Sequence, residues 1–373
     1  MIYLDHHAAT PILPAALREM AEAQARGWAN PSSVHTAGRQ SRALLERARE
    51  RIARAIGAAP ADVVLTAGGT EACNLGVLGA VTAPGGHVVS TPIEHPAVSE
   101  AVRALEVQHG FRTTRLPVPL GAAPDPAAFE AALEPGAQLA AIQWVNHETG
   151  TILPVAAYAD HCRARGVPLF VDATQALGKL PVNVEALGAD FVAFASHKIG
   201  GPAGAGALWV RRGAGLESLA LGGSQERGRR AGTPHVIAQV GFGAACDALA
   251  DRLAAQPHIA QLRDQLETAL LAIGAHRNAP EGTRVATVTN LYFPEQRAEV
   301  LVAALDVEGL ATSAGAACSS GKSEPSPVLL AVHPGEPARA SSSIRFSFGP
   351  ETSEIDIHFA IERIPAVVAR QRR

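Results

Sequence analysis

Apolar residues along this chain recur at two spacings, which predict helices and short strands in alternation. Between residues 37 and 58, apolar positions follow helical spacing among Arg and Glu side chains. Short apolar runs that predict buried strands occur at 63–66, 87–90, 139–145, 169–171, 191–194 and 207–210. Strands that alternate with helical segments predict an α/β fold with a mostly parallel sheet and crossover helices.

The pattern changes beyond residue 250. A long amphipathic helix is expected over 247–274, and strands over 285–293 and 343–348 precede a closing helix over 354–369. A chain of 373 residues exceeds what one core usually supports. We therefore expect a large domain over 14–250 and a smaller α+β domain formed by 1–13 and 251–373.

Composition argues against a nucleic-acid-binding, a membrane-spanning or a secreted protein. The formal net charge of −3 gives no basic field for nucleic acid, and no apolar stretch is long enough to span a bilayer. The N-terminus lacks the order of a secretory signal. The four cysteines form no Cys-x-x-Cys pair and no disulfide framework, so a reducing cytoplasm is the expected location and no metal site is expected.

Lys198 follows the apolar run 191–194 and is itself followed by glycines. A lysine just past a buried strand is where pyridoxal phosphate (PLP) would be bound covalently, because a partly desolvated amine has a lowered pKa and attacks an aldehyde. Taken alone, such a lysine is more often a solvated loop charge. Whether Lys198 is a PLP-binding lysine or a solvated loop charge therefore depends on the other motifs of the chain.

Asp172 ends the apolar run 169–171, at the strand end where open α/β sheets place ligands. PLP needs an acid beside its pyridine nitrogen, because the protonated ring is the electron sink of its chemistry. Asp172 suits that role, and Gln175 could bond the phenolic oxygen. The alternative for Asp172 is a helix cap at a strand-to-helix turn.

A phosphate site is predicted at 68–71, which follows one strand and opens a helix. Free N–H groups and the helix dipole would face an anion there, and Thr70 adds a hydroxyl. The segment is no Walker loop, because Gly-Lys-Ser/Thr is missing. A plain tight turn at Gly68 and Gly69 is the alternative.

With these motifs the chain resembles the class V aminotransferase family of PLP enzymes, and within it the cysteine desulfurases of the NifS and IscS type. The resemblance extends over nearly the whole chain. Its motifs lie at 3–11, 30–35, 66–74, 94–96, 167–175, 195–202, 223–233, 316–321 and 343–347.

The resemblance implies an aspartate aminotransferase-like fold and conversion of L-cysteine to L-alanine. In the family, the residue that matches His95 stacks on the cofactor and handles protons, which imidazole suits; a buried structural histidine is the alternative. The match to Arg345 would bind the substrate carboxylate through its bidentate fork. The implied cofactor-binding residues are Gly69, Thr70, His95, His147, Asp172, Gln175, His197, Lys198 and Thr233.

Cys318 is the expected sulfur acceptor. It lies in a stretch of small residues with Gly and Pro that predicts a mobile loop, like the long loop of one group of desulfurases. A thiolate on such an arm could take sulfur from the substrate as a persulfide and carry it to an acceptor protein, such as an iron–sulfur cluster assembly scaffold. Most lone cysteines are inert small hydrophobes instead, which is what we expect of Cys73, Cys162 and Cys246.

The resemblance also implies a homodimer with shared sites, because the residue matching Thr233 reaches the cofactor phosphate of the neighbouring subunit. Three positions depart from the family: His147 replaces an asparagine that touches cofactor and substrate, Ala195 replaces a phosphate-binding serine, and Pro350 replaces an arginine. These departures leave open another class V reaction, such as selenocysteine lysis or transamination. They also leave open a low-activity homologue that acts through sulfur-transfer partners.

Overall fold

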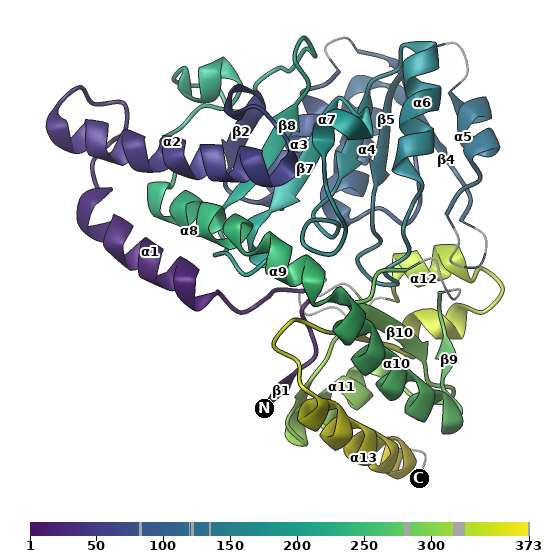
Figure 1. The fold of residues 1–373 in the computed structure, drawn as a ribbon. Helices are drawn as coiled ribbons and strands as arrows, with labels where there is room; N and C mark the ends of the chain where they lie inside the picture. The colour runs from purple at the N-terminus through teal and green to yellow at the C-terminus, as the bar shows by residue number, and fades with distance from the viewer. Residues whose placement is uncertain are drawn as a thin grey trace.

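The computed structural model describes residues 1–81, 84–118, 120, 123–133, 136–279, 284–315 and 325–371. Its main element is a seven-stranded sheet of order β2-β8-β7-β6-β5-β3-β4 (Figure 1). Only β8 runs antiparallel to its neighbours, so the sheet is mixed but mostly parallel, as the sequence predicts. The strands are β2 (Val63–Thr66), β3 (Gly86–Ser90), β4 (Phe111–Arg115), β5 (Ala137–Gln143), β6 (Leu169–Asp172), β7 (Phe191–Ala195) and β8 (Gly206–Val210).

Helices cover both faces of this sheet, and each face has its own apolar layer. One layer includes side chains of α2 (Thr36–Ile56), α6 (Val155–Arg165) and α8 (Val236–Asp247). The opposite layer includes side chains of α3 (Gly69–Leu78) and α4 (Pro96–His109). The remaining helices of this part are α1 (Pro14–Arg26), η1 (Pro60–Asp62), α5 (Pro126–Ala132), α7 (Val184–Leu187), η3 (Ser196–Lys198) and η4 (Gln225–Gly228).

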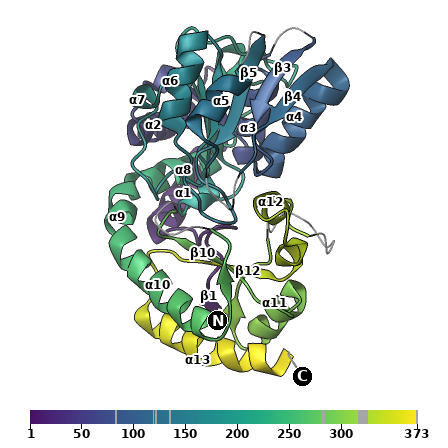
Figure 2. The same ribbon diagram turned by 90° about the vertical axis from the view of Figure 1, so that its right-hand side faces the viewer.

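The C-terminal third forms a second apolar cluster below the large sheet (Figures 1 and 2). Its antiparallel sheet has the order β12-β10-β9, from β9 (His276–Arg277), β10 (Val288–Tyr292) and β12 (Ser343–Ser347). The N-terminal β1 (Ile2–Tyr3) joins this part by pairing with β11 (Leu310–Ala311). Its helices are α9 (Leu249–Ala254), α10 (Gln256–Ala272), α11 (Ala298–Val307), α12 (Pro327–Val332), η5 (Pro337–Ser341) and α13 (Glu354–Gln371).

Several elements differ from the sequence prediction, which did not include the two-residue strands β1, β9 and β11. The single helix expected over 247–274 is interrupted, so that α9 and α10 are separate; Pro257 stands at the start of α10, and proline has no N–H to continue a preceding helix. The longer strand β4 was not predicted, because it is an edge strand whose four polar residues are half-buried or exposed and form no apolar run. Among the described residues, no helix is long and apolar enough to cross a membrane.

The expected domain boundaries at residues 14 and 250 stay a prediction. Cys73, Cys162 and Cys246 are buried free thiols in α3, α6 and α8. Burial raises the pKa of the Cys162 thiol to about 12, which keeps it protonated near neutral pH.

Candidate active site at the carboxyl ends of the parallel strands

Four predicted site residues come from four strands that end at one edge of the large sheet. Asp172 is the last residue of β6, and Lys198 lies in the 3₁₀ turn directly after β7. Gly69 opens α3 after β2, and His95 precedes α4 after β3. These strands run in the same direction, so their carboxyl ends meet at one edge, where ligands of open α/β sheets bind.

Lys198 is held against the N-terminal segment of the chain. Its Nζ donates to the carbonyl oxygens of His7 at 2.6 Å and Ala8 at 2.9 Å. Thr10 ties this segment to the turn that carries the lysine, since its N and its Oγ1 each lie 2.9 Å from the carbonyl oxygen of His197. The amine is therefore oriented by residues nearly 200 positions away in the sequence.

Asp172 is buried and has a local structural role as well. Its Oδ1 accepts hydrogen bonds from the backbone N of Thr174 at 2.9 Å and from the Thr174 hydroxyl at 2.7 Å. This turn resembles the cap that was the alternative interpretation, and it fixes the carboxylate at the strand end. Gln175 follows in the same turn and donates from Nε2 to the carbonyl oxygen of His7 at 2.8 Å.

The N-terminus of α3 is crowded by one side chain at the end of β7 and one in the turn after β6. A Cβ built on Gly69 would lie 3.0 Å from both the Ala195 Cβ and the Thr174 Cγ2. The side chain of Ala195 therefore faces the helix N-terminus where the family's serine would bind phosphate. Ser196 does not replace it: its buried Oγ has no hydrogen-bond partner among the described residues and lies where a Cβ on Gly201 would be 2.1 Å away.

His95 caps α4, since its Nδ1 accepts a hydrogen bond from the backbone N of Ala97 at 3.1 Å. In the neutral ring this contact leaves the proton on Nε2. Burial lowers the pKa of His95. The negative charge of Asp172 raises this pKa, whereas the positive charges of Lys198 and Arg345 lower it further, and the net shift is downward. Burial and then Lys198 also lower the pKa of His197, to about 4, so both imidazoles are neutral near pH 7.

His147 lies edge-on to His95, with the two ring centres 5.1 Å apart. It is buried, and its Nδ1 has no hydrogen-bond partner within the described part of the chain. Burial, and then the neighbouring His95, hold the pKa of His147 well below its usual value. Its Nε2 is 3.8 Å from Oε1 of Glu148, a buried carboxyl whose pKa is raised by that burial.

Arg345 on β12 joins the C-terminal part to this site. Its Nη1 donates to the carbonyl oxygen of His147 at 3.0 Å, and its Nη2 donates to Oδ1 of Asp5 at 2.8 Å. Its Nε is buried without a partner among the described residues. A substrate carboxylate would therefore have to share or displace these bonds, and the predicted substrate role of Arg345 stays a prediction.

Of the remaining predicted residues, one lies away from this site and one cannot be placed. Thr233 is exposed, between η4 and α8. Cys318 lies outside the described residues. The described residues that flank it do approach the site: Ser326 donates from Oγ to Oε2 of Glu148 at 2.7 Å, and a Cβ on Gly315 would lie 3.8 Å from the same oxygen.

Two buried ionisable residues at this edge were missed from the sequence. Lys179 donates from Nζ to Oε1 of Gln175 at 2.7 Å, and burial holds its pKa well below the usual value for lysine. Glu94 accepts from Oγ1 of Thr91 at 2.6 Å, and burial raises its pKa to about 8. The available signal for Lys179 was a single cation inside the apolar stretch 176–181.

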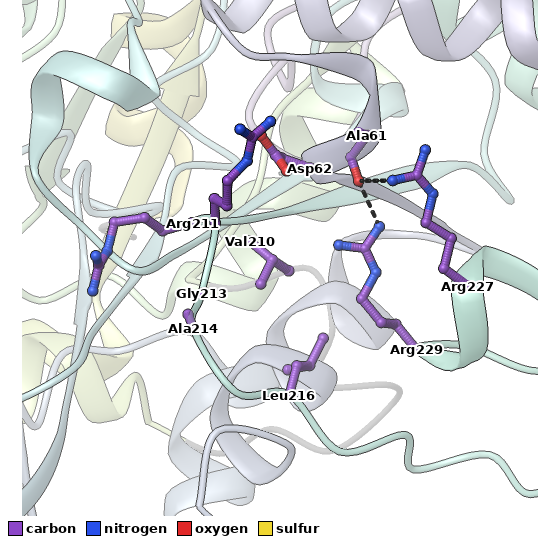
Figure 3. Close-up of a pocket in the computed structure, with 10 residues that line it drawn as sticks. Ala61, Asp62, Val210, Arg211, Gly213, Ala214, Leu216, Arg227 and Arg229 are labelled. Carbon is purple, nitrogen blue, oxygen red and sulfur yellow. Dashed lines mark hydrogen bonds between the residues drawn. The ribbon is translucent and has the colours of Figure 1, made fainter.

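A separate surface pocket lies beside β8 and η4 (Figure 3). Arg227 and Arg229 approach it from η4 and the residue after it, and both donate to the carbonyl oxygen of Ala61. Arg211 also lines it and pairs with Asp190. None of the predicted site residues within the described part of the chain lines this pocket, so it is distinct from the edge of the sheet described above.

Comparisons with known proteins agree along the whole chain. The family model described as "Aminotransferase class-V" matches residues 2–359. An IscS-like cysteine desulfurase of Mycobacterium tuberculosis is 39% identical, over 100% of this chain and 98% of its own. A cysteine desulfurase of Enterobacter agglomerans is 38% identical, over 100% and 93%.

Solved structures give the same result for the fold. A NifS-like protein superposes with a TM-score of 0.92 at 28% identity and covers 99% of both chains. A NifS-like protein from Rickettsia africae has a TM-score of 0.89 at 28% identity, over 98% of this chain and 99% of its own. A structure described as SspA in complex with cysteine has a TM-score of 0.81 at 29% identity, over 95% and 100%. The chain belongs to the class V aminotransferase family, whose members depend on PLP.

Proposed function

We infer that this protein is a PLP-dependent cysteine desulfurase, which converts L-cysteine to L-alanine. The observation that carries the inference is an amine, Lys198, at the same sheet edge as the buried carboxylate Asp172, in a chain related end to end to cysteine desulfurases. The protein described as SspA in complex with cysteine supports the choice of substrate.

The residues at this edge fit PLP by their chemistry. Asp172 would accept the pyridinium N–H, and the N-terminus of α3 at Gly69 and Thr70 would hold the phosphate with its free N–H groups. The neutral imidazole of His95 would lie on the ring, and Gln175 Nε2 would face the phenolic oxygen. Lys198 would bind the aldehyde carbon. When bound, PLP supplies an electron sink for the carbon next to the substrate amine.

The chain's own groups would handle the protons, the carboxylate and the sulfur. Arg345 would orient the substrate carboxylate, which is the recognition that a guanidinium fork performs best. Lys198 would move the proton at the substrate Cα. His95 would act as a proton or hydrogen-bond donor through its Nε2–H. The thiolate of Cys318 would bond to the substrate sulfur; the Cβ–S bond breaks, Cβ keeps the electron pair and is protonated, and alanine leaves.

Three further features belong to this proposal. The persulfide on Cys318 would pass its sulfur to an acceptor protein, such as an iron–sulfur cluster assembly scaffold. The protein would act as a homodimer in which Thr233 reaches the partner's cofactor phosphate. Its location would be cytoplasmic, since the cysteines in the described residues are free thiols.

The test combines a visible absorbance spectrum with a sulfide assay. The purified protein should absorb in the visible range as PLP enzymes do, change its spectrum with L-cysteine, and release sulfide with a thiol reductant. Cys318→Ser should keep both spectra and release no sulfide, because a hydroxyl cannot accept sulfur as a thiolate does. Undiminished sulfide from that variant would reject Cys318 as the acceptor.

The replacement at His147 favours one second candidate, a related reaction on another small amino acid. Its Nδ1, which has no hydrogen-bond partner among the residues that the structure describes, places a different polar group beside His95 where the family has asparagine. The same assay with L-selenocysteine and with L-alanine plus a keto acid separates the candidates. Turnover of either in preference to L-cysteine would reject the desulfurase assignment.

A further inference from the structure

Lysine is rare in this chain and concentrated at the active site. Of its 32 Lys and Arg residues only three are lysine, at positions 179, 198 and 322, so arginine supplies nearly all of the surface cations. Lys179 is 8% exposed, although burying an ammonium group is costly unless it is well partnered. A buried lysine in a chain that otherwise uses arginine suggests a specific task.

The turn after Gln175 directs Lys179 back toward the site. Gly178 has φ of +75°, and a Cβ there would lie 3.2 Å from both Ile199 and Leu249, so the tight turn depends on glycine. The backbone N of Lys179 donates to the carbonyl oxygen of Ala176 at 3.0 Å. This turn lets the Lys179 side chain return to Gln175, four residues earlier, with a 2.7 Å bond from Nζ to Oε1.

The contacts on either side of Gln175 determine which way its amide points. The amine of Lys179 is a donor in its charged form and can still donate when neutral, and a carbonyl oxygen only accepts. Oε1 therefore faces Lys179, and Nε2 faces the carbonyl oxygen of His7 at 2.8 Å. Lys198 donates to the same His7 oxygen at 2.6 Å, so the amide nitrogen and the Lys198 amine share one acceptor.

We propose that Lys179 is a positioning residue of this active site, which holds the Gln175 amide so that Nε2 is offered to the phenolic oxygen of PLP. The inference rests on the proposed function, because it needs the cofactor beside Gln175. Without Lys179, Oε1 would lose its buried donor, and the amide would be held only by the bond from Nε2 to the His7 carbonyl oxygen, an acceptor that Nε2 shares with Lys198. Lys179 touches neither substrate nor cofactor in this role.

The positioning has a measurable electronic consequence. A hydrogen bond donated to the phenolic oxygen stabilises its negative charge, and so lowers the pKa of the proton that the PLP–Lys198 chromophore carries. Loss of that donor should raise this pKa by roughly one unit, which is about tenfold in proton affinity. The pKa is read from the visible absorbance of the loaded protein against pH, without turnover.

Four proteins form the absorbance test: wild type, Lys179→Met, Gln175→Ala and the double variant. Methionine matches lysine in length and removes the donor. We expect each single change to raise the chromophore pKa and the double variant to match Gln175→Ala, since both changes remove one interaction. A wild-type pKa in Lys179→Met, or additive shifts in the double variant, would overturn the proposal. If no chromophore forms in wild type, the proposed function itself fails.

A second measurement uses the apoprotein and needs no change at Lys179. With ¹³C-labelled lysine, the NMR spectrum should contain three Cε signals, one for each lysine. The variants Lys198→Ala and Lys322→Ala each remove one signal, and the third signal then belongs to Lys179. Gln175→Ala should shift the Lys179 signal, while a change at exposed Glu354 should not. An unmoved signal in folded Gln175→Ala would reject the contact on which the proposal depends, even if Lys179→Met does not fold.

Discussion

At Ala195, one missing hydroxyl changes what surrounds the N-terminus of α3. The Ala195 side chain faces Gly69, while the hydroxyl of the next residue, Ser196, faces Gly201 instead. A hydrogen bond to a charged phosphate is worth about 1.5–3 kcal/mol when well placed. The chain therefore lacks the hydroxyl that a serine at position 195 would offer to a phosphate at the N-terminus of α3.

Ala195→Ser should tighten PLP binding by roughly ten- to hundredfold, because the new hydroxyl would face the phosphate. The measurement is the apparent dissociation constant of PLP after stripping and titrating back. Ser196→Ala is the matched control and should leave the constant unchanged. Equal constants for Ala195→Ser and wild type would mean that the phosphate is already satisfied.

Lys198→Ala should abolish the visible absorbance of the bound cofactor, because the amine that would hold the aldehyde is removed. Borohydride reduction of wild type, followed by peptide mass analysis, should identify a cofactor adduct on Lys198. The three lysines make this assignment unambiguous. An adduct on Lys179 or Lys322 would show that Lys198 has another role.

At the scale of elements, one buried carboxylate ties together the helix and strands of the C-terminal part. Glu267 on α10 accepts hydrogen bonds from Arg277 on β9, from Arg284, and from Thr289 on β10. Burial alone would raise the pKa of Glu267, but the bonds from Arg284, Thr289 and Arg277 outweigh it and lower the pKa to about 2. The folded state therefore favours the charged carboxylate.

This depressed pKa predicts a dependence of stability on pH. The contribution of Glu267 is present above the unfolded pKa, near 4.3, and is lost as the pH falls toward 2. Glu267→Gln should lower the melting temperature at pH 7, and the difference from wild type should shrink by pH 3. Exposed Glu354→Gln serves as the control and should change neither value. A difference that is constant with pH would contradict the assignment.

At the scale of the whole molecule, the segment that carries Thr233 is fastened to α2, β2 and α3 of the large-sheet part. Glu226, with a left-handed φ of +49°, accepts from Arg49 Nη2 at 2.8 Å and from the backbone N of Leu65 at 2.9 Å. Arg230 donates from Nε to Glu71 on α3 at 2.7 Å. These buried and half-buried pairs fix the segment, while the side chain of Thr233 itself is exposed.

Mixing of subunits tests whether Thr233 acts across a dimer. Thr233→Glu should remove PLP binding, because its carboxylate would repel the phosphate, and Lys198→Ala should independently remove the amine that forms the chromophore. A heterodimer of the two variants would contain one intact site if Thr233 serves its partner, so each heterodimer should carry about half of the chromophore of a wild-type dimer. If Thr233 acts within its own subunit, no chromophore returns.

The sequence by itself determined the elements and the residues at their ends. Apolar runs located the buried strands, and because parallel strands bring their carboxyl ends to one edge, Asp172, Lys198, His95 and Gly69 could be expected together. The edge strand β4 escaped prediction, since its polar residues satisfy no periodic pattern. The interruption between α9 and α10 lies beside Pro257. This proline is a local signal for a helix start, but the helical spacing of apolar residues continues across it and predicted one long helix.

Only the tertiary structure decided how residues remote in sequence share one site. Nothing local to Lys198 indicates that its amine bonds to the carbonyl oxygens of His7 and Ala8, or that Arg345 is already paired with Asp5. The role of Lys179 depends on a turn that buries it against Gln175. Spacing along a chain predicts which face of an element is buried, whereas hydrogen-bond partners depend on which elements meet, and that is settled by packing of the whole chain.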